Sequence, residues 1–401
     1  MIIWLLVRKG LRHYALSTAV TAFSIALACG LLMAVWIAKT QSHETFTQIN
    51  GGFDAVLGAR SSKLQLVLNA IFHLEASPAN VAWSDFTEIS SNASVALAVP
   101  IAMGDNYRGF RVVGTMPELF THNEYMPGRR YEVKQPGRFF DPQFREAVVG
   151  SFAARKLRLK RGDTFQPYHG LSFNAEKQHE ETYTVVGVME PSNTPADRVL
   201  WIPLEGVQTM SGHAQAAATE ISAVLVKLRS PMAGAALDMV YNKRGNKLTW
   251  AWPIGATMAE LLNKVGWFDR VLELVAALVA LVAAGTVLAS IHNSMNERRR
   301  QIAVLRALGA HRRTIFSAIV LEAGTIAAVG VAAGFLVYGL ILTVVAEIIR
   351  AETGVVLEPW AWNPVFLWAP AGMILLSLLA GMIPAWKGYR MDVAQNLTPG
   401  E

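Results

Sequence analysis

Long apolar runs alternate with polar stretches along this chain. The first run has no charged residue over 24 positions, and the third is interrupted only by Glu322 and Glu347. A bilayer span needs about 20 apolar residues. The pattern therefore predicts four transmembrane helices, at residues 15–38, 270–291, 315–349 and 365–386.

The third run is longer than a membrane is thick. As one helix, residues 315–349 would extend about 52 Å at 1.5 Å per residue, whereas the hydrocarbon core measures roughly 30 Å. We expect its final turns to leave the bilayer or to lie along it. Residues 350–364 are then a short external loop.

The polar region between the first two spans, residues 39–269, is large enough to fold as a domain of mixed α and β structure. Residues 62–74 show helical periodicity, Ser84 is a candidate helix cap, and Gly104-Asp105-Asn106 is a candidate hairpin turn. β-branched runs predict four further strands, at residues 147–149, 182–188, 199–202 and 221–228. The ends of this region, residues 39–48 and 256–269, are predicted to be helical stalks.

Composition and charge agree with a membrane protein. The chain is 52% hydrophobic and 16% charged, with a mean hydropathy of +0.31. Basic residues gather near both ends, while residues 39–270 hold 24 bases against 22 acids. Because basic loops stay in the cytoplasm, we expect both termini inside and the large domain outside. Its balanced charge offers no basic stripe for nucleic acid.

The chain begins with a short cytoplasmic segment, residues 1–14, which is mostly apolar with Arg8 and Lys9 set into it. It is either an interfacial helix or a basic flank of the first span. The run that follows is too long for the apolar part of a signal peptide. Cys29 is the only cysteine, so no intrachain disulfide can form. The tail, residues 387–401, is expected in the cytoplasm.

The loop between the second and third spans, residues 292–314, is strongly basic. Six arginines fall within 18 residues, against the single acid Glu297. Its apolar residues share one face at helical spacing, and Gly309 provides a stop at the C′ position. The loop is therefore predicted to present a short amphipathic helix to the cytoplasm. Alternatively, its arginines only fix topology and contact anionic lipid.

Several stretches resemble the MacB/FtsX/LolCE family of ABC transporter permeases. The most specific is ERRRQIAVLRALGAHRRTIFSAIVLEA at residues 297–323. Further landmarks are the basic segment 5–13, VVGVMEPSNTPADRVLWIPLE at 185–205 and AGMIPAWKGYRMDVAQNL at 380–397. The resemblance covers nearly the whole chain. It implies that the middle of the outer domain, about residues 117–215, is an inserted lobe.

The resemblance also implies a function. In this family the loop is a coupling helix that docks on a separate ATPase subunit. The residues expected to couple are Glu297, Arg298, Arg299, Arg300, Ile302, Leu305, Arg306, Leu308 and Gly309. Two permeases, identical or related, then work with two ATPases in the bacterial inner membrane. ATP-driven movement of the outer domain would export or extract a lipoprotein or another amphipathic molecule, with a periplasmic adaptor, lipoprotein or hydrolase as a further candidate partner.

Two other function classes remain open from the sequence. One is an FtsX-like signalling permease that regulates a cell-wall hydrolase without transport. The other is a membrane-anchored enzyme, which lacks a catalytic constellation. His169, His179, Glu180 and Glu181 are close in sequence, but without a recognisable metal-ligand spacing they are interpreted as solvated loop residues. We assign no metal or cofactor to this chain. A phosphate-binding loop is missing, so ATP and Mg²⁺ are expected on the partner ATPase.

Small residues and one acid mark the third span. Gly330 and Gly334 form a G-x-x-x-G pattern, which lets two helices approach closely. We expect this face to contact a second copy, with packing inside one subunit as the alternative. Glu322 lies about 12 Å into the helix, where an ionised carboxylate is costly unless paired. It either caps a partner helix or is held protonated.

Overall fold

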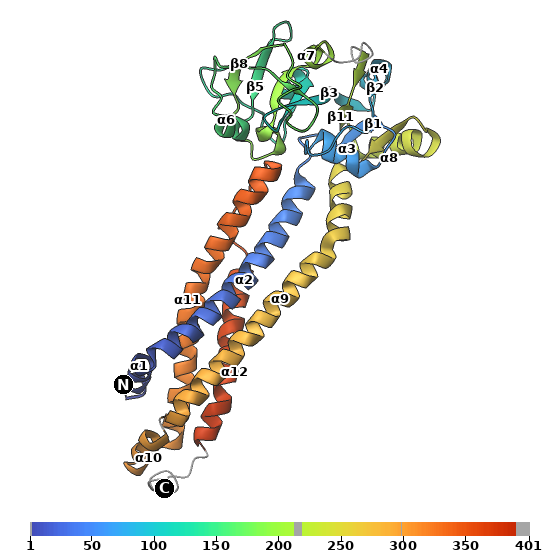
Figure 1. Cartoon of the computed structure of the whole chain (residues 1–401). Helices are drawn as coiled ribbons and strands as arrows, with labels where there is room; N and C mark the ends of the chain where they lie inside the picture. The colour runs from blue at the N-terminus through green and yellow to red at the C-terminus, as the bar shows by residue number, and fades with distance from the viewer. Residues whose placement is uncertain (1, 212–218, 298, 390–401) are drawn as a thin grey trace. The chain divides into compact units, whose positions relative to one another are not determined.

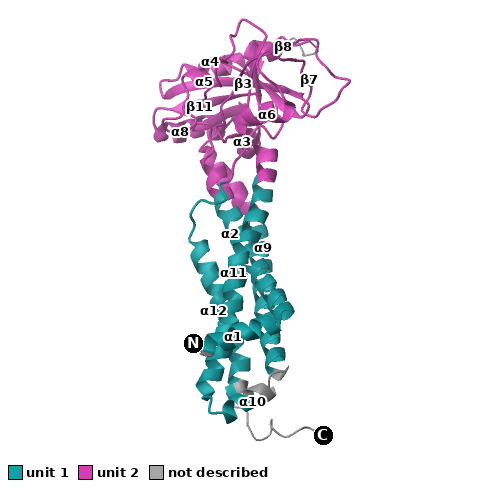
Figure 2. Cartoon of the chain, turned by 90° about the vertical axis from the view of Figure 1, so that its left-hand side faces the viewer, with its two compact units in different colours: residues 1–41, 266–346, 358–401 teal, residues 42–265, 347–357 magenta. Residues whose placement is uncertain are grey.

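The computed structural model describes residues 2–211, 219–297 and 299–389 (Figure 1). The chain divides into two compact units (Figure 2). The helical unit comprises residues 1–41, 266–346 and 358–401, and the α/β unit comprises residues 42–265 and 347–357. The cuts at residues 41 and 265 lie close to the predicted limits of the outer domain, 39–269.

The helical unit contains the four predicted spans. Helices α2, α9, α11 and α12 are long and apolar enough to cross a membrane, which confirms the four-helix prediction among the described residues. The helices that contribute to this unit are α1 (Ile2–His13), α2 (Ala15–Gln48), α9 (Ile254–Glu297), α10 (Arg299–Ala307), α11 (Arg312–Thr353) and α12 (Val365–Tyr389). Large apolar side chains such as Leu16 and Leu336 are 82% and 77% exposed, as expected of a lipid-facing surface.

The small residues of α11 pack against α2 of the same chain. A Cβ added to Gly330 would lie 2.7 Å from Cβ of Ile25, and one added to Gly334 would lie 3.1 Å from Cβ of Cys29. Glycine at these positions allows the two backbones to approach this closely. The face is filled within one chain, which corrects the expectation that it contacts a second copy and favours the alternative of packing inside the subunit.

The α/β unit is built on one twisted sheet. The strands are β1 (Ala55–Ala59), β2 (Val81–Ala82), β3 (Val95–Tyr107), β4 (Phe110–Thr115), β5 (Glu146–Val149), β6 (Thr164–Phe165), β7 (Tyr168–His169), β8 (Tyr183–Val188), β9 (Leu200–Pro203), β10 (Glu220–Ile221), β11 (Ala223–Leu228) and β12 (Leu248–Ala251). Ten of the described strands form the main sheet, in the order β12-β1-β11-β3-β4-β9-β5-β8-β6, with β7 paired to β3. Strands β2 and β10 form a separate ladder.

Both faces of the sheet are covered. Neighbouring residues of β1 alternate between two apolar clusters: Val56 belongs to one, with Trp201, and Leu57 to the other, with Trp250. This alternation follows from the period of two along a strand. The covering segments are α3 (Lys63–Ala70), α4 (Trp83–Ser90), α5 (Glu118–Thr121), α6 (Ser151–Leu157), η1 (Pro195–Arg198), α7 (Leu204–Gln208), α8 (Pro231–Asp238) and η3 (Met239–Arg244).

Some local predictions are wrong. The hairpin turn lies at Arg108 and Gly109, both with positive φ, and not at residues 104–106, where β3 continues with an irregular register. Helix α4 has Ala82 at its N-cap and lacks a side-chain cap, so Ser84 does not cap it. The run 221–228 is split into β10 and β11. By contrast, Ser62 caps α3 through Gln65 N.

The segment 117–215 extends the same sheet. Strands β5, β6, β8 and β9 continue from β4 by hydrogen-bonded pairing, parallel between β4 and β9 and antiparallel between β9 and β5. The segment therefore does not separate as a compact unit of its own, because its strands share the sheet with the flanking segments.

Candidate functional site

The candidate coupling helix α10 ends as the sequence predicts. Gly309 has a φ of +98°. Its amide donates to the carbonyl of Arg306 at 3.1 Å, and the Ala310 amide donates to the carbonyl of Leu305 at 3.0 Å. These two hydrogen bonds form a Schellman motif, in which the left-handed residue at C′ is most often glycine. The end of α10 is thus fixed by backbone geometry.

The described side chains of α10 have different environments. Ala303 is 2% exposed, Leu305 is partly buried and Leu308 is 81% exposed. Arg306 is also partly buried. Among the described apolar residues that we expect to couple, Leu308 is therefore the one most open to a partner.

The other expected coupling residues lie at the edge of the described structure. Arg298 is outside the described residues. Glu297 ends α9, while Arg299, Arg300 and Ile302 belong to α10, but the side chains of these four are also outside the described part.

A cavity of about 560 Å³ lies beside α10 within the helical unit. Leu305 lines it, together with Lys9 and Arg12 of α1 and Glu322 of α11. Glu322 is buried, with 9% exposure, so its carboxylate shares a partly apolar space with basic residues of the same chain. Because Leu305 lines this cavity, a charge at residue 305 would alter contacts within the chain as well as any surface for a partner.

The two stalks lead into neighbouring strands. Helix α2 continues to Gln48 and is followed by β1, while α9 begins at Ile254 directly after β12. β1 and β12 are paired antiparallel, with Val56 opposite Ala251. The predicted stalks are therefore confirmed as continuous helices, and both lead into one pair of hydrogen-bonded strands.

The stalk ends also touch each other directly. A Cβ added to Gly255 of α9 would lie 2.5 Å from the carbonyl oxygen of Thr47 in α2. Real Cβ atoms essentially never come so close to another heavy atom. Glycine therefore permits the close approach of the two helices within the α/β unit.

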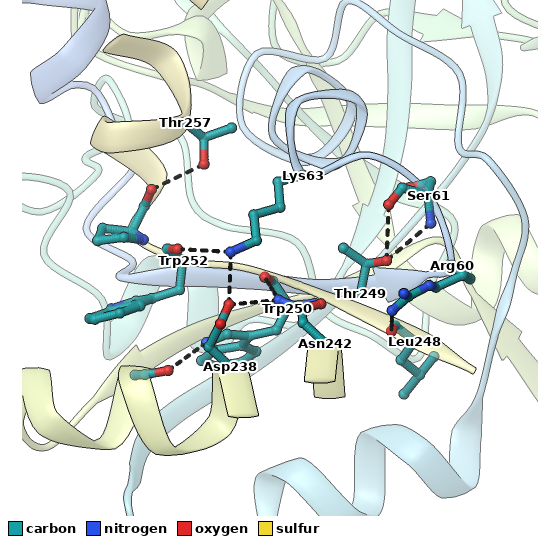
Figure 3. Close-up of polar contacts among 12 residues, drawn as sticks. Arg60, Ser61, Lys63, Asp238, Asn242, Leu248, Thr249, Trp250, Trp252 and Thr257 are labelled. Carbon is teal, nitrogen blue, oxygen red and sulfur yellow. Dashed lines mark hydrogen bonds and ion pairs between the residues drawn. The ribbon is translucent and has the colours of Figure 1, made fainter. Parts of the chain in front are cut away.

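Polar side chains anchor β12 where it passes into α9 (Figure 3). Lys63 Nζ donates to Asp238 at 2.7 Å and to the carbonyl of Trp252 at 3.5 Å. Asn242 Nδ2 donates to the carbonyl of Trp250 at 2.7 Å, and Asn242 Oδ1 accepts from the amide of Trp250 at 3.0 Å. Burial opposes ionisation of Asp238, but hydrogen bonds from Lys63 and Asn242 outweigh it and lower its pKa. This network connects the residues just before α9 to helices α3, α8 and η3.

The end of α11 belongs to the α/β unit. Residues 347–357 cluster with this unit, and Val355 is fully buried in its core. Gly354, at φ +78°, lies against Arg198, and the guanidinium of Arg350 lies over the ring of Phe152. This placement agrees with the expectation that the final turns of the third span leave the bilayer. The predicted external loop 350–364, however, begins within the last turn of α11, and the irregular segment that follows packs Val355 into the α/β core.

Among the residues that the structure describes, one cluster of metal-ligating residue types lies in the α/β unit. His179 Nε2 is 3.1 Å and His169 Nδ1 is 3.5 Å from Asp105 Oδ1. The interpretation of this region as solvated loop is wrong for His179 and Glu181, which are 5% and 8% exposed, and right for Glu180. Sequence reasoning missed Asp105, which it placed in a hairpin turn. The signal for it was the alternation of Val99, Ile101 and Met103 running on past Gly104.

Comparisons with known proteins identify the class. The MacB-like periplasmic core domain matches residues 14–239, and the FtsX-like permease C-terminal domain matches residues 273–393. The first match alone covers more than half of the chain. The chain therefore belongs to the MacB/FtsX-like family of ABC transporter permeases, with four candidate membrane helices and a periplasmic core domain between the first and second.

Individual relatives are more distant. An uncharacterized ABC transporter permease of Methanocaldococcus jannaschii is 32% identical over 129 residues, which are 31% of this chain and 31% of that protein. The match thus spans about a third of that relative's length.

Two solved structures are also similar. The periplasmic region of MacB from Actinobacillus actinomycetemcomitans has a TM-score of 0.36 at 13% identity, covering 55% of this chain and 96% of that one. The extracellular domain of the noncanonic ABC-type transporter YknZ from Gram-positive bacteria has a TM-score of 0.30 at 17% identity, covering 49% of this chain and 98% of that one.

Proposed function

We propose that this permease transmits the movement of a separate ATPase to its α/β unit. The carrying observation is that α2 and α9 each extend as one helix beyond an apolar span, and that short segments join them to one pair of adjacent strands, β1 and β12. Only a few residues separate each helix from its strand, so a displacement of either helix along its axis moves that strand. Backbone hydrogen bonds between β1 and β12 then pass the movement on to the sheet.

The proposal assigns the docking role to the loop containing α10. Its six arginines favour a cytoplasmic position, and its amphipathic helix has a fixed end at Gly309. ATP and Mg²⁺ bind the partner ATPase, and this chain binds neither. Two permeases, as a pair of identical or related chains, act with two ATPases, since the family resemblance implies a paired assembly.

The orientation follows from the distribution of charge. Basic residues near both termini and in the central loop support a cytoplasmic position for these parts, with the α/β unit outside the inner membrane. A cysteine introduced at Asp163 should then be labelled only from outside. Labelling from the cytoplasmic side would contradict this orientation.

The transported material is proposed to be an amphipathic molecule, such as a lipoprotein, taken up at the outer face of the membrane. Support comes from the size of the α/β unit and from the sparse charge of the four spans, whose sequences show no continuous polar path for a hydrophilic solute. Purifying the complex from its native membrane and identifying what stays bound tests this substrate class. A stoichiometric cell-wall hydrolase in place of a lipoprotein would favour the signalling function.

Nucleotide hydrolysis tests whether the partner ATPase, and not this chain, hydrolyses ATP. The purified chain alone should hydrolyse no ATP, and turnover should appear when the partner ATPase is added. Robust turnover by the pure chain, retained when its arginine-rich loop is changed, would contradict the proposal.

A further inference from the structure

Asp105, His169 and His179 bring three metal-ligand atoms together from distant parts of the α/β unit. The Oδ1, Nδ1 and Nε2 atoms all lie within 4.8 Å of one another. Two ligands of a tetrahedral ion with bonds of about 2.0–2.1 Å lie about 3.3 Å apart. The distances of 3.1 Å and 3.5 Å from Asp105 Oδ1 to the two histidines match this separation.

The backbone sets up this arrangement. β7 pairs with β3 so that His169 lies opposite Asp105 in the register. The chain then folds back, and the His179 amide donates to the carbonyl of Pro167 at 2.9 Å. Asn106 Nδ2 holds the intervening loop through the carbonyl of Gly170 at 2.7 Å. The three side chains are therefore positioned by β3, β7 and their connections, and not by chance contacts of surface loops.

The tautomer of His179 favours a cation beside it. Nδ1 lies 2.7 Å from the carbonyl oxygen of Ser211, which only accepts hydrogen bonds, so Nδ1 carries the proton. In a neutral ring Nε2 then directs its lone pair toward the Asp105 carboxylate. Two electron-rich atoms at 3.1 Å require a positive charge between them, either a proton or a metal ion. A histidine that donates its other N–H to a backbone carbonyl is the usual arrangement around protein-bound metals.

A further residue holds the Ser211 carbonyl in place. The amide and the hydroxyl of Ser211 both donate to the carboxylate of Glu181, at 2.9 Å each. Glu181 is thus a positioning residue for His179. The side chain of Asp105 is fully buried, whereas that of His169 is 47% exposed, so the cluster opens to solvent on the His169 side.

We propose that Asp105, His169 and His179 bind one divalent metal ion of the zinc type, with water at the position left open to solvent. Two imidazoles and one carboxylate suit such an ion, and hard cations such as Ca²⁺ prefer oxygen ligands alone. The ion joins β3 to β7 and to the segment that carries His179. It therefore stabilises the pairing of β7 with β3, independently of the transport function.

Zinc content of the full-length chain tests the proposal. The protein is purified in detergent with an affinity tag free of histidine, stripped with a chelator and dialysed against buffered Zn²⁺, and bound metal is counted by mass spectrometry. We expect one zinc per chain in the wild type. Asp105→Asn and His179→Ala should lose it, and Glu181→Gln should bind it about 10–100-fold more weakly. The matched control is His122→Ala, which removes an exposed histidine of the same unit and should keep full occupancy.

If substitutions at the buried residues Asp105 and His179 prevent folding, the variant His169→Ala still tests the proposal. Since His169 is half exposed, its removal should leave the fold intact, measured as an unchanged melting temperature in the chelated protein. Co²⁺ loading adds a direct signal, because visible d–d absorption should appear in the wild type and change in His169→Ala. A wild type without zinc, or equal zinc in the wild type and in the folded His169→Ala variant, would overturn the proposal.

Discussion

Gly255 in the first turn of α9 lies directly against the backbone carbonyl oxygen of Thr47 near the end of α2. At this point the two stalks are in contact within the α/β unit. A methyl group at residue 255 would lie 2.5 Å from that oxygen, so one of the two helices would have to move.

Gly255→Ala should therefore destabilise the chain by about 1–3 kcal/mol, as overpacking against a fixed backbone does. The measurement is the free energy of unfolding in detergent with a chemical denaturant. Gly266→Ala is the matched control, because residue 266 lies in the same helix and its added Cβ meets no atom within 4 Å. This control should be neutral or more stable by about 0.5–1 kcal/mol. Equal effects of the two changes would contradict the close contact.

His73 should make stability depend on pH. Burial, aided by the positive charge of Arg111, lowers its pKa from 6.5 to about 3. Because the folded-state pKa lies below the unfolded one, the contribution of neutral His73 is complete above pH 6.5. It is lost progressively as the pH falls toward 3. At pH 5 the loss amounts to about 2 kcal/mol.

The check compares the free energy of unfolding at pH 7.5 and pH 5. His73→Phe should reduce the difference between the two values, whatever its effect at pH 7.5. His122→Phe, at an exposed histidine, should retain the full difference. If His73→Phe and the wild type lose the same stability, His73 is not a buried neutral residue.

Val355 should contribute to the core of the α/β unit although it follows a membrane helix. It is 0% exposed, so Val355→Ala should cost about 1–3 kcal/mol through lost methyl groups and the cavity left behind. Val344→Ala is the control on the preceding helix α11, since Val344 is 54% exposed and should change stability by less than about 0.5 kcal/mol. If Val355→Ala leaves the free energy of unfolding unchanged, residues 347–357 do not pack on this core.

The spans could be predicted because their signal is local. An uncharged run of the length of residues 15–38 has few other interpretations, and Gly309 was recognisable as a helix stop from its neighbours alone. The strands β1 and β12 were not predicted. Each is only four or five residues long, and each is defined by pairing with the other across most of the domain.

The candidate metal cluster was missed for the same reason. His169 and His179 were visible as neighbours in sequence, but Asp105 joins them only through the pairing of β7 with β3. The faces of α11 were recognised from Gly330 and Gly334, yet the pattern cannot tell a partner helix in the same chain from one in another chain. The structure decides this, since α2 fills that face.

Leu308 tests where the ATPase docks. Leu308→Asp puts a carboxylate on the most exposed of the coupling residues' described apolar side chains and should weaken ATPase binding about tenfold or more. His311→Asp adds the same charge to the same loop without removing apolar surface, so it should bind nearly normally. The measurement is the affinity between the purified permease and its ATPase. Equal affinities for the two variants would show that the apolar face is not the contact.

The central claim is that α10 and the stalks carry nucleotide-driven movement to the α/β unit. It is tested most directly by the distance between spin labels at Arg161→Cys in the two permeases of the assembled complex, with and without a non-hydrolysable ATP analogue. Cys29 is fully buried and stays unlabelled. Gly309→Pro removes both the positive φ and the amide that donates to Arg306, which should uncouple the helix end while the ATPase remains bound. We predict that nucleotide shifts the distance in the wild type and leaves it unchanged in Gly309→Pro. The same shift in both, with the ATPase fully bound, would contradict the account.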